Sequence, residues 1–332
     1  SATSSRRRPL KSTAHMALLL LGVLSPAGAL LAGATISPTD RARNFWVLCG
    51  RDGVPPAGSL ELCKDIVSAQ RAGDSEALEQ AMRRIAQLPV AVEMAVASDG
   101  GRRFALPATT ATTVGASGGG RGGLLEFREL SFGEGGHGSK TWPAGVALSI
   151  WTQRNARFVA GQRVLELGSG IGIAGLSAAL AGAAHVTLTD VAEDERWAGL
   201  STRLQANLQS NARASGVEAV ASVEPLDWEA CVADDYEPAR RYQRLLGSDL
   251  AYDERSIEAL VATVTKHLVP GGQACLVNVC DREGPPAAAS AAFVEQLQRS
   301  VEGEVLVEQA ALVNNYEKTD LIVLTFTKRQ DS

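Results

Sequence analysis

The chain has 332 residues, of which 45% are apolar and 21% are charged, so it is long enough for one large domain with extensions and can bury a substantial core. The formal net charge is −5, and residues 1–34 contain four cations and no acid, which leaves 28 cations against 37 acids, or −9, for the rest. No local basic patch stands out, which argues against a nucleic-acid-binding surface.

The five cysteines show no spacing typical of metal ligands, and we predict no metal site. Cys275 and Cys280 lie in an apolar, strand-like run and are predicted to be inert core thiols. Cys49 and Cys63 are either two free thiols, the interpretation we favour, or a pair in an oxidising compartment.

Residues 1–34 have the composition of a targeting segment. Arg6–Arg8 precede an apolar run, Met16–Leu31, which Pro26 interrupts, and Ala32–Ala34 follows as an A-x-A pattern. Three interpretations stay open: a plastid transit peptide, a secretory or twin-arginine signal, and a single membrane anchor through 16–31. The run is short and broken by proline for a stable span. We therefore expect an organellar, plastid location, with a cytoplasmic or membrane-anchored protein as the alternative.

Residues 35–89 have helical periodicity over 60–69 and 75–88, with Asp74 or Ser75 as an N-cap, and predict a small helical extension. Residues 90–138 are rich in glycine and predict a β-hairpin of Arg103–Leu106 and Leu124–Leu130, joined by a flexible loop that includes 115–123. His137 lies among glycines in a predicted loop, and we assign it no role.

The main domain is predicted to occupy residues 139–332. It opens with Trp142-Pro143-Ala144, where the proline suits the first turn of a helix that continues to about Phe158. Trp142 either covers the edge of a ligand or fills the core, and the sequence leaves both alternatives open.

The segment 163–190 predicts a parallel strand–helix–strand unit around a glycine-rich turn. An apolar strand ends at Leu167, the turn contains Gly168, Gly170 and Gly172, and the second strand ends at Asp190. Glycine allows the backbone to approach a ligand, and an acid at the end of the second strand is placed to accept hydrogen bonds from a ribose diol. The unit therefore predicts a nucleoside-binding site.

Two nucleoside cofactors fit this unit. Gly170-x-Gly172-x-x-Gly175 satisfies the dinucleotide fingerprint, but that match is weak on its own. Glu166, just before the turn, suits a cofactor that carries an ammonium group, whereas it would repel a pyrophosphate. The sequence therefore favours S-adenosylmethionine over NAD.

The rest of the chain alternates strands and helices. A helix over 200–214 is followed by a strand that leads to Asp227 and Trp228, which are suited to bind an adenine amino group and to pack on its face; a loop acid and a buried tryptophan are the alternative. The next strand ends at Ser248-Asp249-Leu250-Ala251-Tyr252. Because parallel strands place their carboxyl ends at one edge, this segment is expected beside Gly168 and Asp190.

The set of motifs resembles the seven-β-strand, or class I, S-adenosylmethionine-dependent methyltransferases of family 16, which include protein lysine methyltransferases. The resemblance covers roughly 124–328 and is carried by Trp142-Pro143-Ala144, the 164–172 turn, Leu226-Asp227-Trp228 and Asp249-x-x-Tyr252. It implies an α/β fold with a Rossmann-like, seven-stranded, mostly parallel sheet. The two last β runs, 304–312 and 321–327, predict an antiparallel hairpin at its edge.

The resemblance also implies roles for individual residues. Asp249 and Tyr252 would face the methyl acceptor, which we expect to be a lysine of a protein that the sequence does not identify. Histidine or small-molecule methylation on the same fold, and a non-catalytic scaffold, are the alternatives. The oligomeric state is not predicted. Cofactor contacts are expected from Trp142, Glu166, Gly168, Ser169, Gly170, Gly172, Asp190, Asp227, Trp228 and Ser248.

Overall fold

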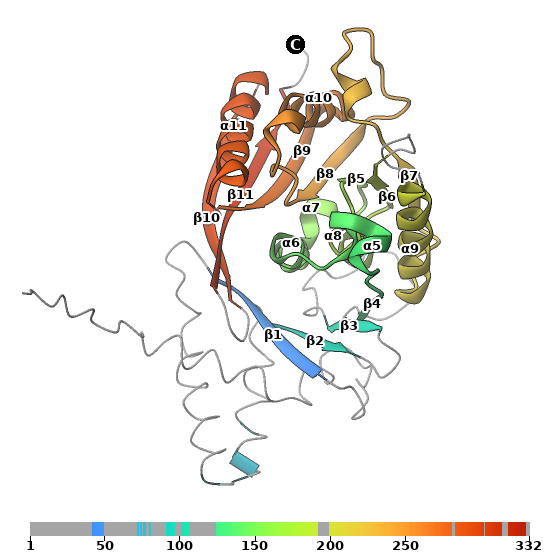
Figure 1. Cartoon of the computed structure of the whole chain (residues 1–332), viewed down its shortest axis with the longest axis vertical. Coiled ribbons are helices and arrows are strands. Elements are labelled where there is room, and N and C mark those ends of the chain that lie inside the picture. The colour runs from blue at the N-terminus through green and yellow to red at the C-terminus, as the bar shows by residue number, and fades with distance from the viewer. Residues whose placement is uncertain are drawn as a thin grey trace, which may run out of the picture.

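The fold was analysed in a computed structural model, shown in Figure 1. It describes residues 42–49, 91–96, 101–105, 124–191, 199–280, 283–301, 303–313 and 318–329, with positions 72, 74, 76, 77 and 80. The predicted targeting segment 1–34, Cys63, the predicted helix over 60–69 and the loop over 115–123 lie outside these residues.

The described strands form one sheet in the order β4-β3-β2-β1-β10-β11-β9-β8-β5-β6-β7. The strands are β1 (Ala42–Cys49), β2 (Ala91–Val96), β3 (Arg102–Ala105), β4 (Leu124–Phe127), β5 (Arg163–Leu167), β6 (His185–Asp190), β7 (Ala221–Pro225), β8 (Tyr242–Ser248), β9 (Leu268–Val279), β10 (Val305–Val313) and β11 (Lys318–Thr327).

The seven strands from β7 to β10 form the predicted methyltransferase sheet. Strands β7, β6, β5, β8 and β9 are mutually parallel, and β11 enters between β9 and β10 antiparallel to both. The central strands are apolar and buried, as strands covered on both faces should be. The predicted Rossmann-like fold with an antiparallel hairpin is confirmed.

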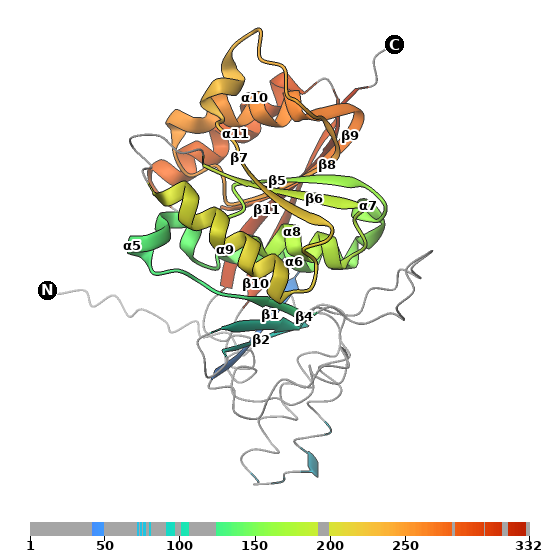
Figure 2. The same ribbon diagram turned by 90° about the vertical axis from the view of Figure 1, so that its right-hand side faces the viewer.

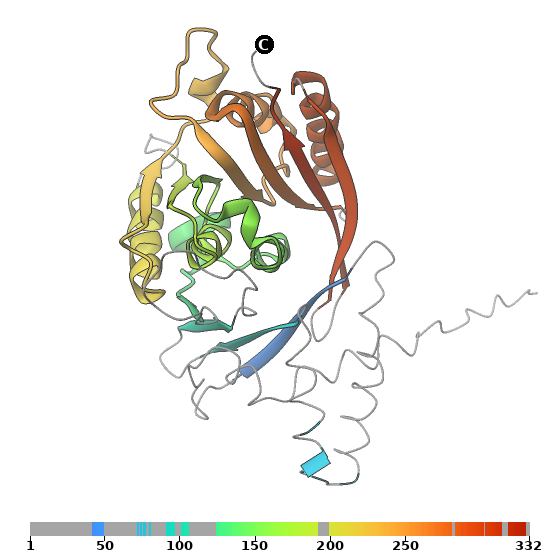
Figure 3. The same ribbon diagram turned by 180° about the vertical axis from the view of Figure 1, so that it is seen from behind.

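The sheet continues past the hairpin into the N-terminal part of the chain (Figure 3). Strand β1 pairs antiparallel with β10, with Val47 opposite Val313, and β2, β3 and β4 follow in order. The predicted hairpin over 103–130 is present as β3 and β4. The extension over 35–89 was predicted to be helical, and this is wrong for 42–49, because pairing with the open edge of β10 satisfies its backbone as a strand.

Helices cover both faces of the parallel strands, as Figure 2 shows: α6, α8 and α9 on one face, and α10 and α11 on the other. The α-helices whose bounds the structure describes are α5 (Phe132–Gly135), α6 (Pro143–Arg154), α7 (Ala156–Val159), α8 (Ile173–Leu180), α9 (Leu200–Ala214), α10 (Ile257–His267) and α11 (Pro285–Ser300). Pro143 occupies the first turn of α6, as predicted.

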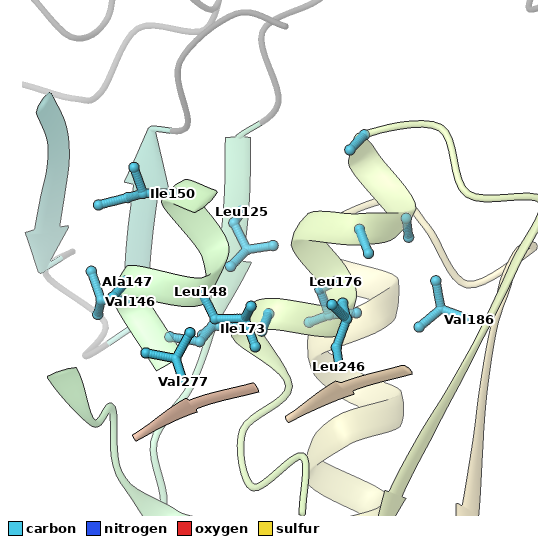
Figure 4. Close-up of a cluster of buried hydrophobic side chains, with 14 of the residues drawn as sticks. Leu125, Val146, Ala147, Leu148, Ile150, Ile173, Leu176, Val186, Leu246 and Val277 are labelled. Carbon is cyan, nitrogen blue, oxygen red and sulfur yellow. The ribbon is translucent and has the colours of Figure 1, made fainter. Parts of the chain in front are cut away.

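Two apolar clusters fill the layers between sheet and helices. The first joins α6 and α8 to the sheet, with Leu148, Ile173 and Leu176 facing Leu246 and Val277 (Figure 4). The second packs α10 and α11 on the opposite face. Clamping the sheet from both sides holds the carboxyl ends of its strands in fixed positions, which is where the predicted site residues lie.

The segment before α6 is part of this domain rather than of a separate 90–138 unit. Arg128 donates its backbone N–H to Asn211 Oδ1 at 2.8 Å, and Asn211 Nδ2 donates to the Ile171 carbonyl at 3.0 Å. Asn207 Nδ2 also donates to the Arg128 carbonyl, at 3.1 Å. The asparagines of α9 therefore fasten the end of β4 to the turn before α8.

Cys275 is buried in β9, as predicted. The prediction for Cys280 is wrong: its side chain is exposed, because it lies just beyond the last residue of β9. Among the residues that the structure describes, no helix is both long and apolar enough to cross a membrane.

Candidate active site

The glycine turn between β5 and α8 is tied to the neighbouring strand. Ser169 donates its N–H to the Thr189 carbonyl at 2.8 Å, and its hydroxyl accepts the Thr189 N–H at 3.0 Å. Gly168 has a φ of 55°, and a Cβ there would lie 2.6 Å from Leu250 Cδ2. This position therefore requires glycine both for its backbone conformation and for its space.

Asp190 ends β6 and reaches back to the same turn. Its Oδ2 accepts the Gly170 N–H at 2.6 Å, and its Oδ1 accepts the Val191 N–H at 2.8 Å. Burial raises the pKa of this carboxyl above its usual value. A carboxylate offers about four acceptor positions, so Asp190 keeps capacity for hydroxyl donors.

Trp228 lies beside both features. Its ring atom Cζ2 would be 3.7 Å from a Cβ at Gly168, and Leu226, two residues before it, donates its N–H to the Asp190 carbonyl at 2.9 Å. Trp228 is half-buried and Asp227 is exposed. The structure thus brings the Leu-Asp-Trp motif to the edge where β5 and β6 end.

The turn after β8 holds Asp249 in an uncommon conformation. Its φ is 56°, the one positive φ of a residue other than glycine among the described residues. Two hydrogen bonds hold it: Asp249 donates its N–H to the Val277 carbonyl at 2.8 Å, and Leu250 donates its N–H to Asn278 Oδ1 at 3.2 Å. Such strain persists only where the surroundings impose it, and it is frequent at functional sites.

The side chain of Tyr252 is influenced by both the predicted cofactor acid, Asp190, and the predicted acceptor acid, Asp249. Burial of its hydroxyl raises the pKa of this phenol, and the negative charges of Asp190, Asp253 and Asp249 raise it further. The ring itself remains 45% exposed. Asp190 and Asp249 therefore act on one side chain from the same edge of the sheet, as the order of the strands predicts.

A sequence profile of the family described as "Lysine methyltransferase" matches residues 125–300, which is more than half of the chain. The chain belongs to the lysine methyltransferase family. Its matched segment begins at β4 and ends with α11, so it contains every residue of the site described above.

Two relatives are similar to parts of this chain. The protein-lysine N-methyltransferase EFM3 of Chaetomium thermophilum is 31% identical over 157 residues, covering 45% of this chain and 44% of the relative. Protein N-lysine methyltransferase METTL21A of Danio rerio is 35% identical over 137 residues, covering 41% and 58%. The chain thus spans about half the length of the curated relatives it matches.

Among solved structures, an O-methyltransferase of Bacillus cereus has a TM-score of 0.42 and 15% identity, over 58% of this chain and 84% of that one.

The lysine methyltransferase family implies S-adenosylmethionine, and the residues at this edge fit it. The turn at Gly168 has no room for a Cβ, Asp190 offers a carboxylate at the end of β6, and Trp228 presents an aromatic ring beside both. Ser248 lies near the start of α6, since a Cβ at Gly145 would be 3.4 Å from its Oγ. Gly168, Asp190 and Trp228 therefore lie close together, and the contacts of the predicted residues with the cofactor stay predictions.

Glu166, another predicted cofactor residue, lies beneath the glycine turn. Its carboxyl is buried beneath the turn, where its Oε2 would be 2.5 Å from a Cβ at Gly175 in the first turn of α8. Burial raises its pKa to about 8, although contacts with Ser169 and the Gly175 backbone lower it in part. This placement gives Glu166 a supporting position under the turn. The predicted contact with an ammonium group stays a prediction.

Trp142 does not fill the core, which resolves the alternative that the sequence left open. Its side chain is 37% exposed, and its Nε1 donates to the His137 carbonyl at 2.7 Å. His137 and Phe132, to which sequence analysis assigned no role, lie beside it with their side chains exposed. Aromatic residues in a glycine-rich segment directly before the Trp-Pro helix were the signal available in the sequence. No cluster of metal-ligand side chains occurs among the described residues.

Proposed function

We propose that this protein transfers a methyl group from S-adenosylmethionine to the side-chain amine of a lysine in a protein substrate. Membership of the lysine methyltransferase family supports the reaction type. The observation that carries the proposal is the contact between two turns: Leu250, the residue after Asp249, has its Cδ2 2.6 Å from the position of a Cβ on Gly168. This contact supports a single site that would combine a nucleoside-binding acid, Asp190, with an acid for the acceptor, Asp249.

When bound, S-adenosylmethionine supplies an electrophilic methyl group on a sulfonium. The residues that would hold it are those of the turn after β5 with Asp190, Trp228 and Asp227. Asp190 would accept hydrogen bonds from the ribose, and Trp228 would pack on the base. The buried Glu166 and the bonds between Ser169 and Thr189 keep the turn in place before the cofactor arrives.

Asp249 would bind and orient the incoming lysine ammonium. The nitrogen must lose a proton, here to water, before it can attack, because a protonated amine has no lone pair. Tyr252 presents a partly buried ring beside Asp249, and a less hydrated surrounding favours the neutral amine. The left-handed backbone at Asp249 keeps its carboxylate in one position, and positioning of the nucleophile is the main contribution of the protein to this reaction.

The test combines cofactor binding with product analysis. Calorimetry with S-adenosylhomocysteine should show binding, and incubation with a protein lysate and methyl-labelled S-adenosylmethionine should give a labelled protein that hydrolyses to methyl-lysine. Label recovered as methyl-histidine, or only in small molecules, would contradict lysine specificity. Absence of S-adenosylhomocysteine binding would contradict methyl transfer altogether and leave the non-catalytic scaffold. Mass-spectrometric mapping of the labelled band identifies the substrate.

For the location of the protein, we propose a plastid, supported by the four cations, the lack of acids and the A-x-A pattern of residues 1–34. Fusion of these residues to a fluorescent protein, with Arg6–Arg8 replaced by glutamine as a control, tests it. Plastid import of the unsubstituted fusion alone supports the proposal. A cytosolic signal contradicts it, and a membrane signal would indicate anchoring through 16–31.

A further inference from the structure

Four aromatic rings meet at the carboxyl edge of the sheet, and His137 lies at their centre. Its ring centroid is 5.3 Å from that of Phe132 in an edge-on arrangement, 5.6 Å from that of Tyr252 and 6.3 Å from that of Trp142. The rings come from two parts of the chain, the segment before α6 and the turn after β8. We name His137, Phe132 and Tyr252 the aromatic wall.

The segment that carries His137 and Phe132 is fastened at several points. Trp142 Nε1 donates to the His137 carbonyl at 2.7 Å, and Arg203 Nε donates to the Glu134 carbonyl at 2.7 Å. The backbones of Gly138 and Gly170 also touch, since a Cβ at Gly170 would lie 3.0 Å from the Gly138 carbonyl oxygen. The segment with Phe132 and His137 is thus held against the nucleoside-binding turn, and the His137 ring contacts Tyr252.

The rings of the wall are unusually accessible. Phe132 is 57% and Tyr252 45% exposed, whereas most large apolar side chains that the structure describes are buried. Core packing does not explain rings left open at a site edge. A ligand that covers them would bury apolar surface, and such burial favours binding.

The charges around the wall select the kind of ligand. The negative charges of Asp190, Asp253 and Asp249 act on Tyr252 and raise the pKa of its phenol, so negative charge reaches the wall. Two cations lie near this segment: Lys140 is paired with Glu129 at 3.6 Å, and Arg203 donates to the Glu134 carbonyl. Aromatic faces combined with negative charge attract an ammonium group, and methylated ammonium groups suit them best because they are large and weakly hydrated.

We propose that the aromatic wall receives the side chain of the acceptor lysine and its methylated products, and that His137 is a specificity-determining residue of this site. The inference rests on the proposed function and deepens it, because it names further residues of the acceptor site, next to Tyr252. His137 contacts both other rings, so the imidazole sets the spacing between Phe132 and Tyr252 and thereby the room available to the nitrogen and its methyl groups.

The test uses protein saturated with S-adenosylhomocysteine and two matched probes. One is Nα-acetyl-Nε-trimethyl-lysine methylamide, and the other is its neutral isostere, in which carbon replaces the charged nitrogen. We expect the cationic probe to bind about tenfold more tightly than the neutral one, as cation–π contacts predict. His137→Ala and Phe132→Ala should each weaken the cationic probe about three- to tenfold, while His137→Phe should retain most of its binding.

Two controls separate the wall from the fold and from the proposed function. His185→Ala removes an imidazole at the start of β6, at the opposite end of the strands, and should leave both probes unaffected. The wall variants should keep the affinity for S-adenosylhomocysteine, since the Trp142 bond ends on the backbone of His137 and survives side-chain replacement.

Equal binding of the two probes, no binding of either at millimolar concentration, or unchanged binding by His137→Ala would overturn the aromatic wall. Failure of the unsubstituted protein to bind S-adenosylhomocysteine or to form methyl-lysine would instead overturn the proposed function, and the probe measurements do not depend on turnover.

Discussion

The side chain of Leu250 occupies the space that a side chain at Gly168 would need. Its Cδ2 lies 2.6 Å from the position of a Cβ on Gly168. Leu250 directly follows Asp249 in the chain. Leu250 is buried and also fills the space beside Gly247, where its Cδ1 would be 2.6 Å from a Cβ. One side chain therefore fixes the distance between the turn for the nucleoside and the turn for the acceptor.

Replacement of Gly168 by alanine should disturb both turns. The left-handed φ of 55° costs a non-glycine residue about 1–2 kcal/mol, and the contact with Leu250 adds about 1–3 kcal/mol of overpacking. We expect a loss of about 2–5 kcal/mol in the free energy of unfolding, measured by urea denaturation, together with weaker binding of S-adenosylhomocysteine. Gly161→Ala is the control: its φ is 70°, but nothing lies within 4 Å of its Cβ.

The contact itself can be isolated with a double-mutant cycle. Leu250→Ala alone should destabilise the protein by removing buried apolar volume, by about 2–5 kcal/mol. In the double variant the new methyl group at position 168 fits into the space left by Leu250. The double variant should therefore lose less free energy of unfolding than the sum of the losses of the two single variants. Strict additivity would show that the two residues are not coupled.

Removal of the charge of Asp249 should separate binding from transfer. Asn tolerates a left-handed backbone and has the same shape, so Asp249→Asn should keep the turn and the affinity for S-adenosylhomocysteine. We expect methyl transfer to fall by about a hundredfold or more, the size of effect typical of a misplaced reactant. Radiolabel transfer and calorimetry on the same preparation provide the comparison, and an equal loss in both would refute the role of Asp249 in holding the acceptor.

Asn278 is predicted to position Asp249 through its hydrogen bond to the backbone of the next residue, Leu250. Its Oδ1 accepts the Leu250 N–H, while its Nδ2 is buried without a hydrogen-bond partner. Asn278→Ala should leave the Leu250 N–H unpaired, lower the free energy of unfolding by about 1–3 kcal/mol, and reduce kcat more than the affinity for S-adenosylhomocysteine. Asn278→Asp keeps the accepting oxygen and should lose less kcat. If Asn278→Ala has the same kcat as the unsubstituted protein, Asn278 does not position Asp249.

Glu166 should make stability depend on pH. Its folded-state pKa is raised from 4.5 to about 8, so folding favours the protonated carboxyl. The contribution of the protonated Glu166 carboxyl to the free energy of unfolding is complete below pH 4.5 and is lost as the pH rises toward 8. Each pKa unit of the shift corresponds to ~1.4 kcal/mol. We therefore expect the free energy of unfolding, measured by urea denaturation, to fall more between pH 5 and pH 8 for the unsubstituted protein than for Glu166→Gln. Equal losses would show that Glu166 is not buried in its neutral form.

The local patterns of the sequence were sufficient for the elements of the main domain. The helix predicted over 200–214 is α9, and the turn with Gly168, Gly170 and Gly172 joins β5 to α8 as predicted. These features follow from periodicity, capping and the torsional freedom of glycine, all of which act between residues that are close in the chain. The meeting of Gly168, Asp190 and Asp249 followed from one rule, that parallel strands end at a common edge.

Burial and contacts between distant segments were decided only by the tertiary structure. The sequence predicts that Glu166 binds the cofactor. In the structure its carboxyl lies under the turn, because α8 packs over it. Phe132 and His137 are separated from Tyr252 by more than a hundred residues, and no local pattern relates them. The sequence by itself determined which chemical groups stand at the strand ends, because that depends on order along the chain. Which of those groups face the acceptor depends on how helices and loops pack, and that is a property of the folded molecule.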